Sequence, residues 1–212
     1  MSDLILALDL GTSSTRTAFF DTDANRLANT TAQQTYPLLT TVDGGAELEP
    51  GVLLSAVRRC LEQTMQRYRS DATLRGRPIA GIAVSCFWHS LVGCDGKGTA
   101  LTNIITWADS RCREDAATLR AELGEKSTHA RTGCMLRASF WPAKLVWYQR
   151  TVKRKFSAVK QWMSPAEWLQ LTLAGDANCA VGMATGTGLF NPSKLTWDET
   201  LLKRCGLSLI HI

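Results

Sequence analysis

Residues 4–20 read LILALDLGTSSTRTAFF, and this stretch decides how the chain begins to fold. An apolar run from Leu4 to Leu8 is followed by Asp9 and a small polar turn, and residues 16–20 then predict a second strand. Gly11 lets the backbone of the turn fold tightly and come close to a ligand. The pattern therefore predicts two strands joined by a turn with a polar tip.

Outward from this hairpin, the sequence predicts a sheet and its first helix. Residues 21–25 have turn chemistry and residues 26–34 favour a third strand, so the chain opens with a three-stranded antiparallel meander. Pro50 suits a first helical position, and apolar residues then recur at helical spacing to position 68. Residues 79–86 predict a buried strand. Two strand candidates around residues 95–98 predict a hairpin.

The second half of the sequence is mainly helical. Helices are predicted over residues 110–123, from Pro142, from the capping box at Ser164 to Gly175, and over residues 197–205. Residues 178–190 are rich in Gly, Ala and Thr without a helical period, which favours a loop. The order of elements predicts one α/β domain over residues 1–212, with a mixed sheet flanked by helices and no dividing linker.

Composition excludes several classes of protein. The 24 Lys and Arg exceed the 19 Asp and Glu by only five and are dispersed, which argues against a nucleic-acid partner. The apolar runs are too short to span a bilayer and the N-terminus lacks a signal-peptide pattern, so we expect no membrane association. Seven cysteines without CxxC spacing favour free thiols and a cytoplasmic location over a disulfide framework or zinc site.

One segment departs from the dispersed charge. Residues 126–166 hold nine Lys and Arg and no acidic residue. Two interpretations stay open. The segment either forms a solvated face or helps to attract an anionic ligand.

The first turn carries candidates for binding a nucleotide phosphate and its metal. Backbone N–H groups beside a glycine and short hydroxyl side chains donate to phosphate oxygens, and an arginine fork pairs with phosphate. A carboxylate at a strand end suits a hydrated Mg²⁺. The turn matches neither a Walker P-loop nor GxGxxG, and a polar hairpin without a ligand is the alternative. The candidates are Gly11, Thr12, Ser13, Ser14 and Arg16 for phosphate and Asp9 for the metal.

Two further segments carry candidates for binding a small polar substrate. Trp88 offers an apolar face to the carbon side of a sugar, and His89 offers a donor or acceptor. Trp107 precedes Asp109, which can pair two hydroxyls, and Arg111, which can pair an acid group or fix Asp109. The alternatives are a structural histidine and a helix N-cap.

Weaker signals follow along the chain. Residues 132–134 lead to an aromatic patch at 139–145, for which core packing is the plainer interpretation. The glycines of residues 184–190 could approach a ligand or could simply form turns.

These segments, in this order, resemble the FGGY family of carbohydrate kinases over essentially the whole chain. Residues 9–14 resemble its first phosphate motif, and residues 82–85 with 88–89 resemble its strand and sugar-binding turn. Residues 106–111 resemble its Trp-x-Asp-x-Arg element. Residues 132–133 with 144–147, and 187–190 with 197–198, resemble two later markers. Residues 86–90, 132–134 and 140–144 are most similar to the gluconate-kinase-like branch.

The resemblance implies an actin-like ATPase, or ribonuclease-H-like, fold that uses ATP with Mg²⁺. It implies phosphoryl transfer to a hydroxyl of a sugar or sugar acid, with gluconate first and a pentulose such as xylulose next. Glycerol is disfavoured because the residues typical of glycerol kinases are missing near His89 and Ser139. Trp88, His89 and Asp109 would orient the sugar.

Family enzymes are longer and have two domains, so residues 1–212 resemble most of the N-terminal, sugar-binding domain. The resemblance implies a C-terminal nucleotide-binding domain that we expect to be absent from these residues and that would be a partner. The resemblance places the catalytic base, an aspartate of a Gly-Asp segment, beyond Ile212, because Gly175-Asp176 comes too early. We therefore expect no catalytic residue within the chain. Whether residues 207–212 are native stays open at this point. A homo-oligomer remains open.

Two other functions remain as alternatives. One is a non-catalytic sugar-binding module or inactive kinase relative, which the missing base favours. The other is a different actin-like ATPase, such as a chaperone or filament protein. That alternative explains residues 9–14 but not residues 88–89 or 107–111.

Overall fold

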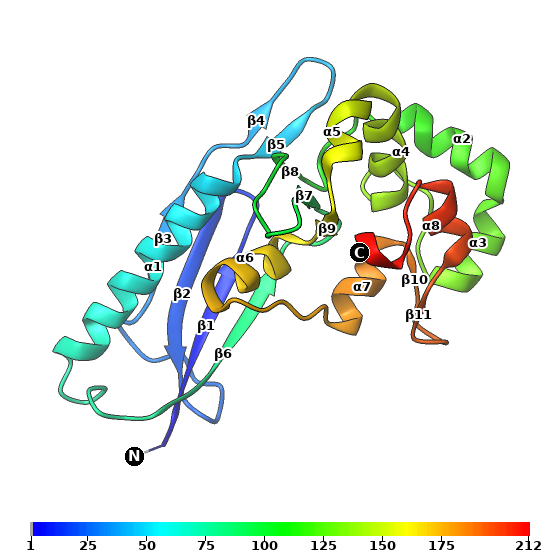
Figure 1. The fold of residues 1–212 in the computed structure, drawn as a ribbon. Coiled ribbons are helices and arrows are strands. Elements are labelled where there is room, and N and C mark those ends of the chain that lie inside the picture. The colour runs from blue at the N-terminus through cyan, green and yellow to red at the C-terminus, as the bar shows by residue number, and fades with distance from the viewer. Residues whose placement is uncertain (1) are drawn as a thin grey trace. The chain divides into compact units, whose positions relative to one another are not determined.

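The computed structural model describes residues 2–212, which form two compact units (Figure 1). Unit 1 comprises Met1–Leu38 and Pro50–Phe87, and unit 2 comprises Leu39–Glu49 and Trp88–Ile212. The chain passes three times from one unit to the other, so neither unit is a continuous stretch of sequence. This explains why no linker composition marks the boundary.

Unit 1 contains a four-stranded sheet in the order β3-β2-β1-β6. Strands β1 (Leu4–Leu10), β2 (Ser14–Phe20) and β3 (Ala32–Thr35) pair antiparallel, as the sequence predicts. The third strand is shorter than predicted, because Arg26 pairs only through an isolated bridge to Phe20. Strand β6 (Ile79–Cys86) lies parallel to β1 and makes the sheet mixed.

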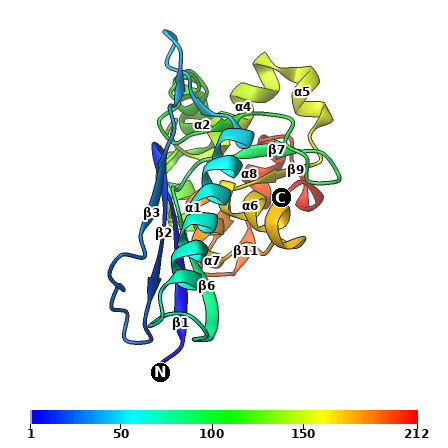
Figure 2. The same cartoon turned by 90° about the vertical axis from the view of Figure 1, so that its left-hand side faces the viewer.

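Helix α1 (Pro50–Ser70) covers one face of this sheet (Figures 1 and 2). It begins at the predicted proline. Its apolar face packs against a cluster formed by Leu4, Leu6 and Phe19. Buried hydrogen bonds add to the contact, since the hydroxyl of Thr17 lies 2.6 Å from that of Thr64. Packing of this kind, rather than helix propensity, gives such a helix most of its stability.

Strand β6 is confirmed as a strand, but the prediction that it is buried is wrong. It lies at the end of the sheet and has a neighbour on one side only. Ile82 is 63% exposed and Val84 is 53% exposed. A continuous apolar run indicates a strand that is buried on both faces, but residues on both faces of β6 are exposed in the described part of the chain.

Unit 2 contains three small antiparallel sheets. Strands β4 (Leu39–Thr40), β5 (Ala46–Leu48) and β8 (Ile104–Ile105) form one, β7 (Val92–Cys94) and β9 (Gln161–Met163) a second, and β10 (Phe190–Asn191) and β11 (Thr196–Trp197) a third. The predicted hairpin is confirmed by the bridges Cys94–Ala100 and Leu91–Ile105.

The four helices predicted in the second half of the chain are present, and the structure adds others that were not predicted. Their bounds are α2 (Arg113–Leu123), α3 (Glu125–Thr132), α4 (Trp141–Thr151), α5 (Lys153–Ala158), α6 (Pro165–Ala174), α7 (Val181–Thr187), α8 (Glu199–Arg204) and the 3₁₀ turn η1 (Leu209–His211). The capping box at Ser164 is present. The prediction of a loop over residues 178–190 is wrong for α7, which ends at Gly188 in the left-handed conformation.

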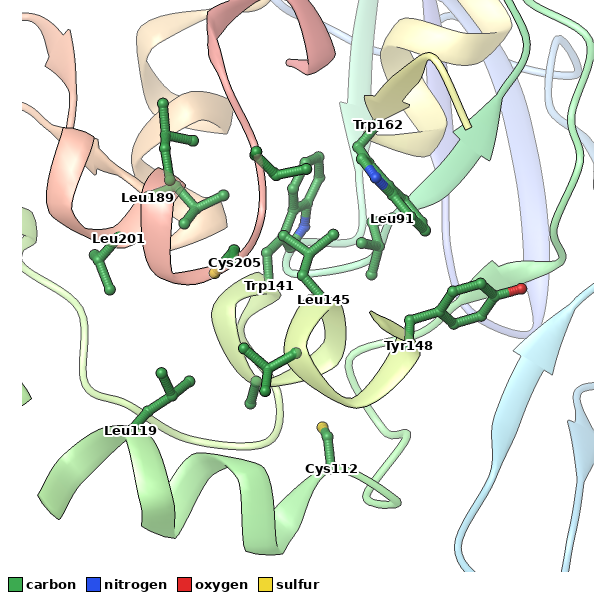
Figure 3. Close-up of a cluster of buried hydrophobic side chains, with 14 of the residues drawn as sticks. Leu91, Cys112, Leu119, Trp141, Leu145, Tyr148, Trp162, Leu189, Leu201 and Cys205 are labelled. Carbon is green, nitrogen blue, oxygen red and sulfur yellow. The ribbon is translucent and has the colours of Figure 1, made fainter. Parts of the chain in front are cut away.

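The core of unit 2 is built around α4 (Figure 3). Trp141 and Leu145 are almost fully buried there, and Trp162 packs in the same cluster. The aromatic patch before this helix is therefore mostly core packing, as the plainer interpretation held. Cys112 and Cys205 are buried in the cluster as small apolar residues, and both are free thiols, as are Cys60, Cys94, Cys134 and Cys179.

Among residues 2–212, no helix has both the length and the apolar character needed to cross a bilayer.

Candidate phosphate and sugar sites

The β1–β2 turn is held in a tight conformation. The Gly11 N–H donates to the Ser14 carbonyl at 2.9 Å, and a Cβ at position 11 would also lie 2.9 Å from that oxygen. Any larger residue would therefore collide with the backbone. Tyr36 braces the turn from β3: its hydroxyl donates to the Gly11 carbonyl at 2.6 Å, and its N–H donates to the Ser13 carbonyl at 3.0 Å.

The tip of this turn offers donors to an anion. Within residues 2–212, the backbone N–H groups of Thr12 and Ser13 make no hydrogen bond. The Ser13 side chain is exposed and Thr12 is partly exposed, but Ser14 is only 6% exposed. Ligand access to the Ser14 hydroxyl is thus restricted. Two adjacent free N–H groups with two hydroxyls suit a phosphate oxygen.

Asp9 and Arg16 form an ion pair across the hairpin. The Arg16 Nη1 lies 3.3 Å from the Asp9 Oδ2, and both side chains are about half exposed. No group of three or more metal-ligating side chains occurs among the described residues. A single accessible carboxylate still fits Mg²⁺, which keeps several waters and binds through one or two carboxylates plus phosphate oxygens.

In unit 2, Ser90 joins the two segments that carry the aromatic candidates. Its buried hydroxyl accepts a hydrogen bond from the Trp107 N–H at 3.0 Å and donates to the Trp88 carbonyl at 3.2 Å. Trp88 remains 52% exposed and Trp107 48% exposed. Exposed tryptophan faces held by a common anchor are suited to stacking on the apolar face of a sugar.

The ring of His89 has a defined proton position. Its Nδ1 lies 2.5 Å from the carbonyl oxygen of Gly186. A carbonyl only accepts, so Nδ1 carries the proton and the neutral ring has its lone pair on Nε2. Burial lowers the pKa of His89, with a smaller contribution from Lys144, so the ring is held neutral. Nε2 can then accept a hydrogen bond from a hydroxyl.

His89 also has an unusual backbone conformation, with a φ of 60°. A left-handed conformation is uncommon for a residue with a side chain and is found most often at functional sites. The contact supports the alternative of a structural histidine for one nitrogen, because Nδ1 bonds the Gly186 carbonyl. Nε2 has no such partner among the described residues, so the role in binding a ligand stays a prediction for that nitrogen.

Two residues from the segments that gave weaker sequence signals, Gly186 and Phe140, complete the surroundings of His89. Gly186 of α7 accepts from its ring, and a Cβ there would come within 3.3 Å of Cδ2 of Trp88. The Phe140 ring lies 4.3 Å from the His89 ring, centroid to centroid. The glycine-rich stretch at residues 184–190 pointed to Gly186 as a possible ligand contact. Its contacts with His89 and Trp88 could not be predicted, because those residues are distant in sequence.

Asp109 and Arg111 form a buried charge network. The Arg111 Nη2 donates to the Asp109 Oδ2 at 2.6 Å and also to Glu47, and the guanidinium lies 4.3 Å from the Trp147 ring centroid. Asp109, which is 2% exposed, also accepts from the Ala46 N–H at 3.0 Å. In the structure Arg111 pairs with Asp109 and Glu47, and its role toward a ligand stays a prediction. The alternative that Asp109 or Ser110 is the N-cap of the next helix is wrong, because the N-cap of α2 is Cys112.

The basic segment at residues 126–166 is partly neutralised by distant carboxylates. Ion pairs join Arg131 to Asp198 and Arg150 to Asp115, and a third joins Arg137 to Glu125. Lys144 is buried. The remaining five basic residues are exposed, which suits the solvated-face interpretation for them.

The candidates fall into two groups. Those for phosphate and metal lie in unit 1, and those for a sugar lie in unit 2. Within unit 2 the structure brings Trp88, His89 and Trp107 together through Ser90, and it turns Asp109 and Arg111 toward one another.

Comparison with known proteins identifies a family that matches nearly the whole chain. Residues 4–212 match the model of the FGGY family of carbohydrate kinases, N-terminal domain. A gluconokinase of Bacillus subtilis is 26% identical over 212 residues, covering 100% of this chain and 40% of its own length. A glycerol kinase of Thermococcus onnurineus is 28% identical over 211 residues, covering 98% and 41%.

One solved structure has a similar level of sequence identity to this chain. The ligand-bound xylulose kinase from Lactobacillus acidophilus superposes with a TM-score of 0.88 at 27% identity, covering 98% of this chain and 41% of that one. The fold is the actin-like, ribonuclease-H-like α/β fold of the sugar kinases. The chain belongs to the FGGY family of carbohydrate kinases and corresponds to its N-terminal domain. It spans about 40% of the length of these relatives.

Proposed function

We propose that this chain supplies the sugar-binding and part of the phosphate-binding machinery of an ATP-dependent carbohydrate kinase. The enzyme would transfer a phosphoryl group to a hydroxyl of a sugar or sugar acid. The observation that carries the proposal is the His89 ring, held at Nδ1 by the Gly186 carbonyl with Nε2 left to accept from a hydroxyl, beside the exposed Trp88.

The parts of the site have separate roles in this proposal. Trp88 and Trp107 stack on the carbon face of the sugar, and His89 orients a hydroxyl through Nε2. The ion pair between Asp109 and Arg111 does not contact the sugar in this proposal. It fixes the segment that carries Trp107. This differs from the sequence-based expectation that Asp109 contacts the sugar, because its carboxylate oxygens already accept from Arg111 and Ala46.

In unit 1, the N–H groups and hydroxyls of Thr12 and Ser13 would bind phosphate oxygens, and Arg16 would pair with phosphate. Asp9 would hold a hydrated Mg²⁺, which neutralises charge on the phosphates when bound. Binding of MgATP would exchange the Asp9–Arg16 ion pair for contacts to metal and phosphate. Half-exposed partners make that exchange inexpensive.

The base that accepts the proton of the attacking hydroxyl lies outside residues 1–212 in this proposal, as does the rest of the nucleotide site. The 212 residues therefore bind sugar without turning it over. Gluconate is the first candidate and xylulose the second. The identities to relatives with different substrates lie within two percentage points and do not rank them. The enzyme would act in the cytoplasm.

Calorimetric titration of this protein with D-gluconate, D-xylulose and glycerol tests the proposal. We expect heat of binding with gluconate or xylulose, lost in His89→Ala and kept in His129→Ala, whose ring is exposed on α3. Binding that survives His89→Ala, or binding of none of the three by the folded protein, would contradict the assigned site.

A second measurement tests the placement of the base. With Mg²⁺ and ATP added, we expect no sugar-dependent ADP formation by these 212 residues. Sugar-dependent turnover would show that the base lies within the chain. Turnover without any response to sugar would instead favour a different actin-like ATPase.

A further inference from the structure

Lys144 of α4 is a buried cation without a carboxylate partner. Its side chain is 1% exposed, and no described carboxylate lies within ion-pair distance of it. The ammonium donates instead to two backbone carbonyls, that of Ala138 at 2.9 Å and that of Ser139. All of its contacts are thus directed at the turn that precedes its own helix.

This arrangement is energetically unfavourable for a lysine. A buried charge costs free energy unless it is paired, and Lys144 stands in the first turns of α4, where the positive end of the helix dipole repels it. Burial lowers the pKa of Lys144 to about 8, although Cys112 and Asp109 favour the charged form. An apolar residue would fill the space at lower cost, so stability does not explain the lysine.

The turn that Lys144 holds leads directly to the surroundings of His89. Residues 138–139 form the turn, and the Phe140 N–H closes it by donating to the Arg137 carbonyl at 3.2 Å. The Ala138 carbonyl also accepts from the Cys112 thiol at 3.2 Å. The next residue, Phe140, places its ring 4.3 Å from that of His89.

We propose that Lys144 is a positioning residue for His89. Its ammonium fixes the carbonyls of Ala138 and Ser139, so that Phe140 packs on the imidazole and keeps it directed at the Gly186 carbonyl. The His89 Nε2 is thereby kept in place for a hydroxyl. The value of that position rests on the proposed function, but the mechanical link between Lys144 and His89 does not.

The test compares Lys144→Met, which keeps the length and loses the charge, with Lys144→Gln, whose amide can still donate to a carbonyl. Lys155→Met, on the exposed face of α5, is the matched control. The readout is the ¹⁵N chemical shift of the His89 ring nitrogens near neutral pH, assigned with His89→Gln. It reports directly which nitrogen carries the proton.

We expect the Lys155→Met ring to keep its proton on Nδ1, as in the unmodified protein. In Lys144→Met we expect signals averaged between the two tautomers, partly restored in Lys144→Gln. Affinity for the sugar that binds should fall about tenfold in Lys144→Met. An unchanged His89 tautomer in a folded Lys144→Met protein would overturn the proposal.

Two further measurements cover the cases in which a variant does not fold or no sugar binds. If Lys144→Met does not fold, Phe140→Leu breaks the link at its next member, and an unchanged His89 tautomer there overturns the proposal. If no sugar binds the unmodified protein, the proposed function fails while the tautomer measurement still decides the role of Lys144.

Discussion

At the scale of single residues, His89 combines three features that restrict its ring and its backbone. Its backbone is left-handed, its ring is half-buried, and one nitrogen is committed to the Gly186 carbonyl. Strained backbone of this kind costs about 1–3 kcal/mol and persists only where the surroundings enforce it. Phe140 and Gly186 provide that enforcement, which leaves Nε2 as the free group of a rigid ring.

The lowered pKa of His89 predicts how stability depends on pH. The folded state binds the imidazole proton less readily than the unfolded state, whose pKa is about 6.5. The unfolding free energy therefore falls as pH decreases through 6.5 toward the lower folded pKa. Urea unfolding at several pH values should show this decrease in the unmodified protein and a smaller one in His89→Gln. Equal slopes would contradict the assignment of a buried neutral ring.

The network around Arg111 gives a second prediction. Arg111→Met leaves Asp109 buried without its partner, and breaking such a pair costs about 3–5 kcal/mol. We expect a loss of that size in urea unfolding, and partial recovery in the double variant Arg111→Met, Asp109→Asn. A loss of sugar binding with unchanged stability would instead mean that Arg111 contacts the ligand.

The sequence could indicate the candidate residues of the site but not their partners. Trp88, His89 and Trp107 stand in short motifs whose residue types suggest sugar binding. Glu47 lies 64 residues before Arg111 in the chain, and Gly186 lies 97 residues after His89. Only the fold brings such residues together, so the burial of Asp109 and the proton position on His89 could not be predicted.

At the scale of elements, the predictions that succeeded rest on local chemistry. The proline that begins α1, the capping box of α6 and the turn between β1 and β2 all depend on residues close in sequence. Helix α7 was missed because its small residues show no helical period, and its partners, such as Trp88, come from elsewhere. The exposure of β6 was missed because an apolar run does not reveal how many neighbours a strand has.

Helix α8 provides a prediction at this scale. Asp198 is its N-cap, accepting from the Leu201 N–H at 3.0 Å, and it pairs with Arg131 at 2.6 Å. Asp198→Ala removes both interactions and should lower the unfolding free energy by about 2 kcal/mol. Asp198→Asn keeps an acceptor and should cost less. Glu199→Ala, at an exposed position beside it, is the control. Equal urea midpoints for Asp198→Ala and the control would contradict this role.

At the scale of the whole molecule, the open edge of β6 predicts self-association. An apolar edge strand with unpaired backbone groups is a template for pairing with another chain. Sedimentation velocity over a concentration series should show association of the 212-residue protein.

Val84→Lys places a charge on this edge and should suppress the association, while Val42→Lys, on a fully exposed loop, should not. A protein that stays monomeric at every concentration would contradict the prediction.

The interleaving of the two units along the chain has a consequence for synthesis. A ribosome releases the chain from its N-terminus, and domains begin to fold as they emerge. Residues 39–49 emerge before the second half of unit 1, yet their strand β5 pairs with β8, which comes after unit 1 is complete. Strand β5 can pair with β4 at once, but it must wait without its second partner, β8, while the first sheet closes on β6. Translation speed between residues 50 and 105 then sets how long it remains exposed to chaperones and proteases.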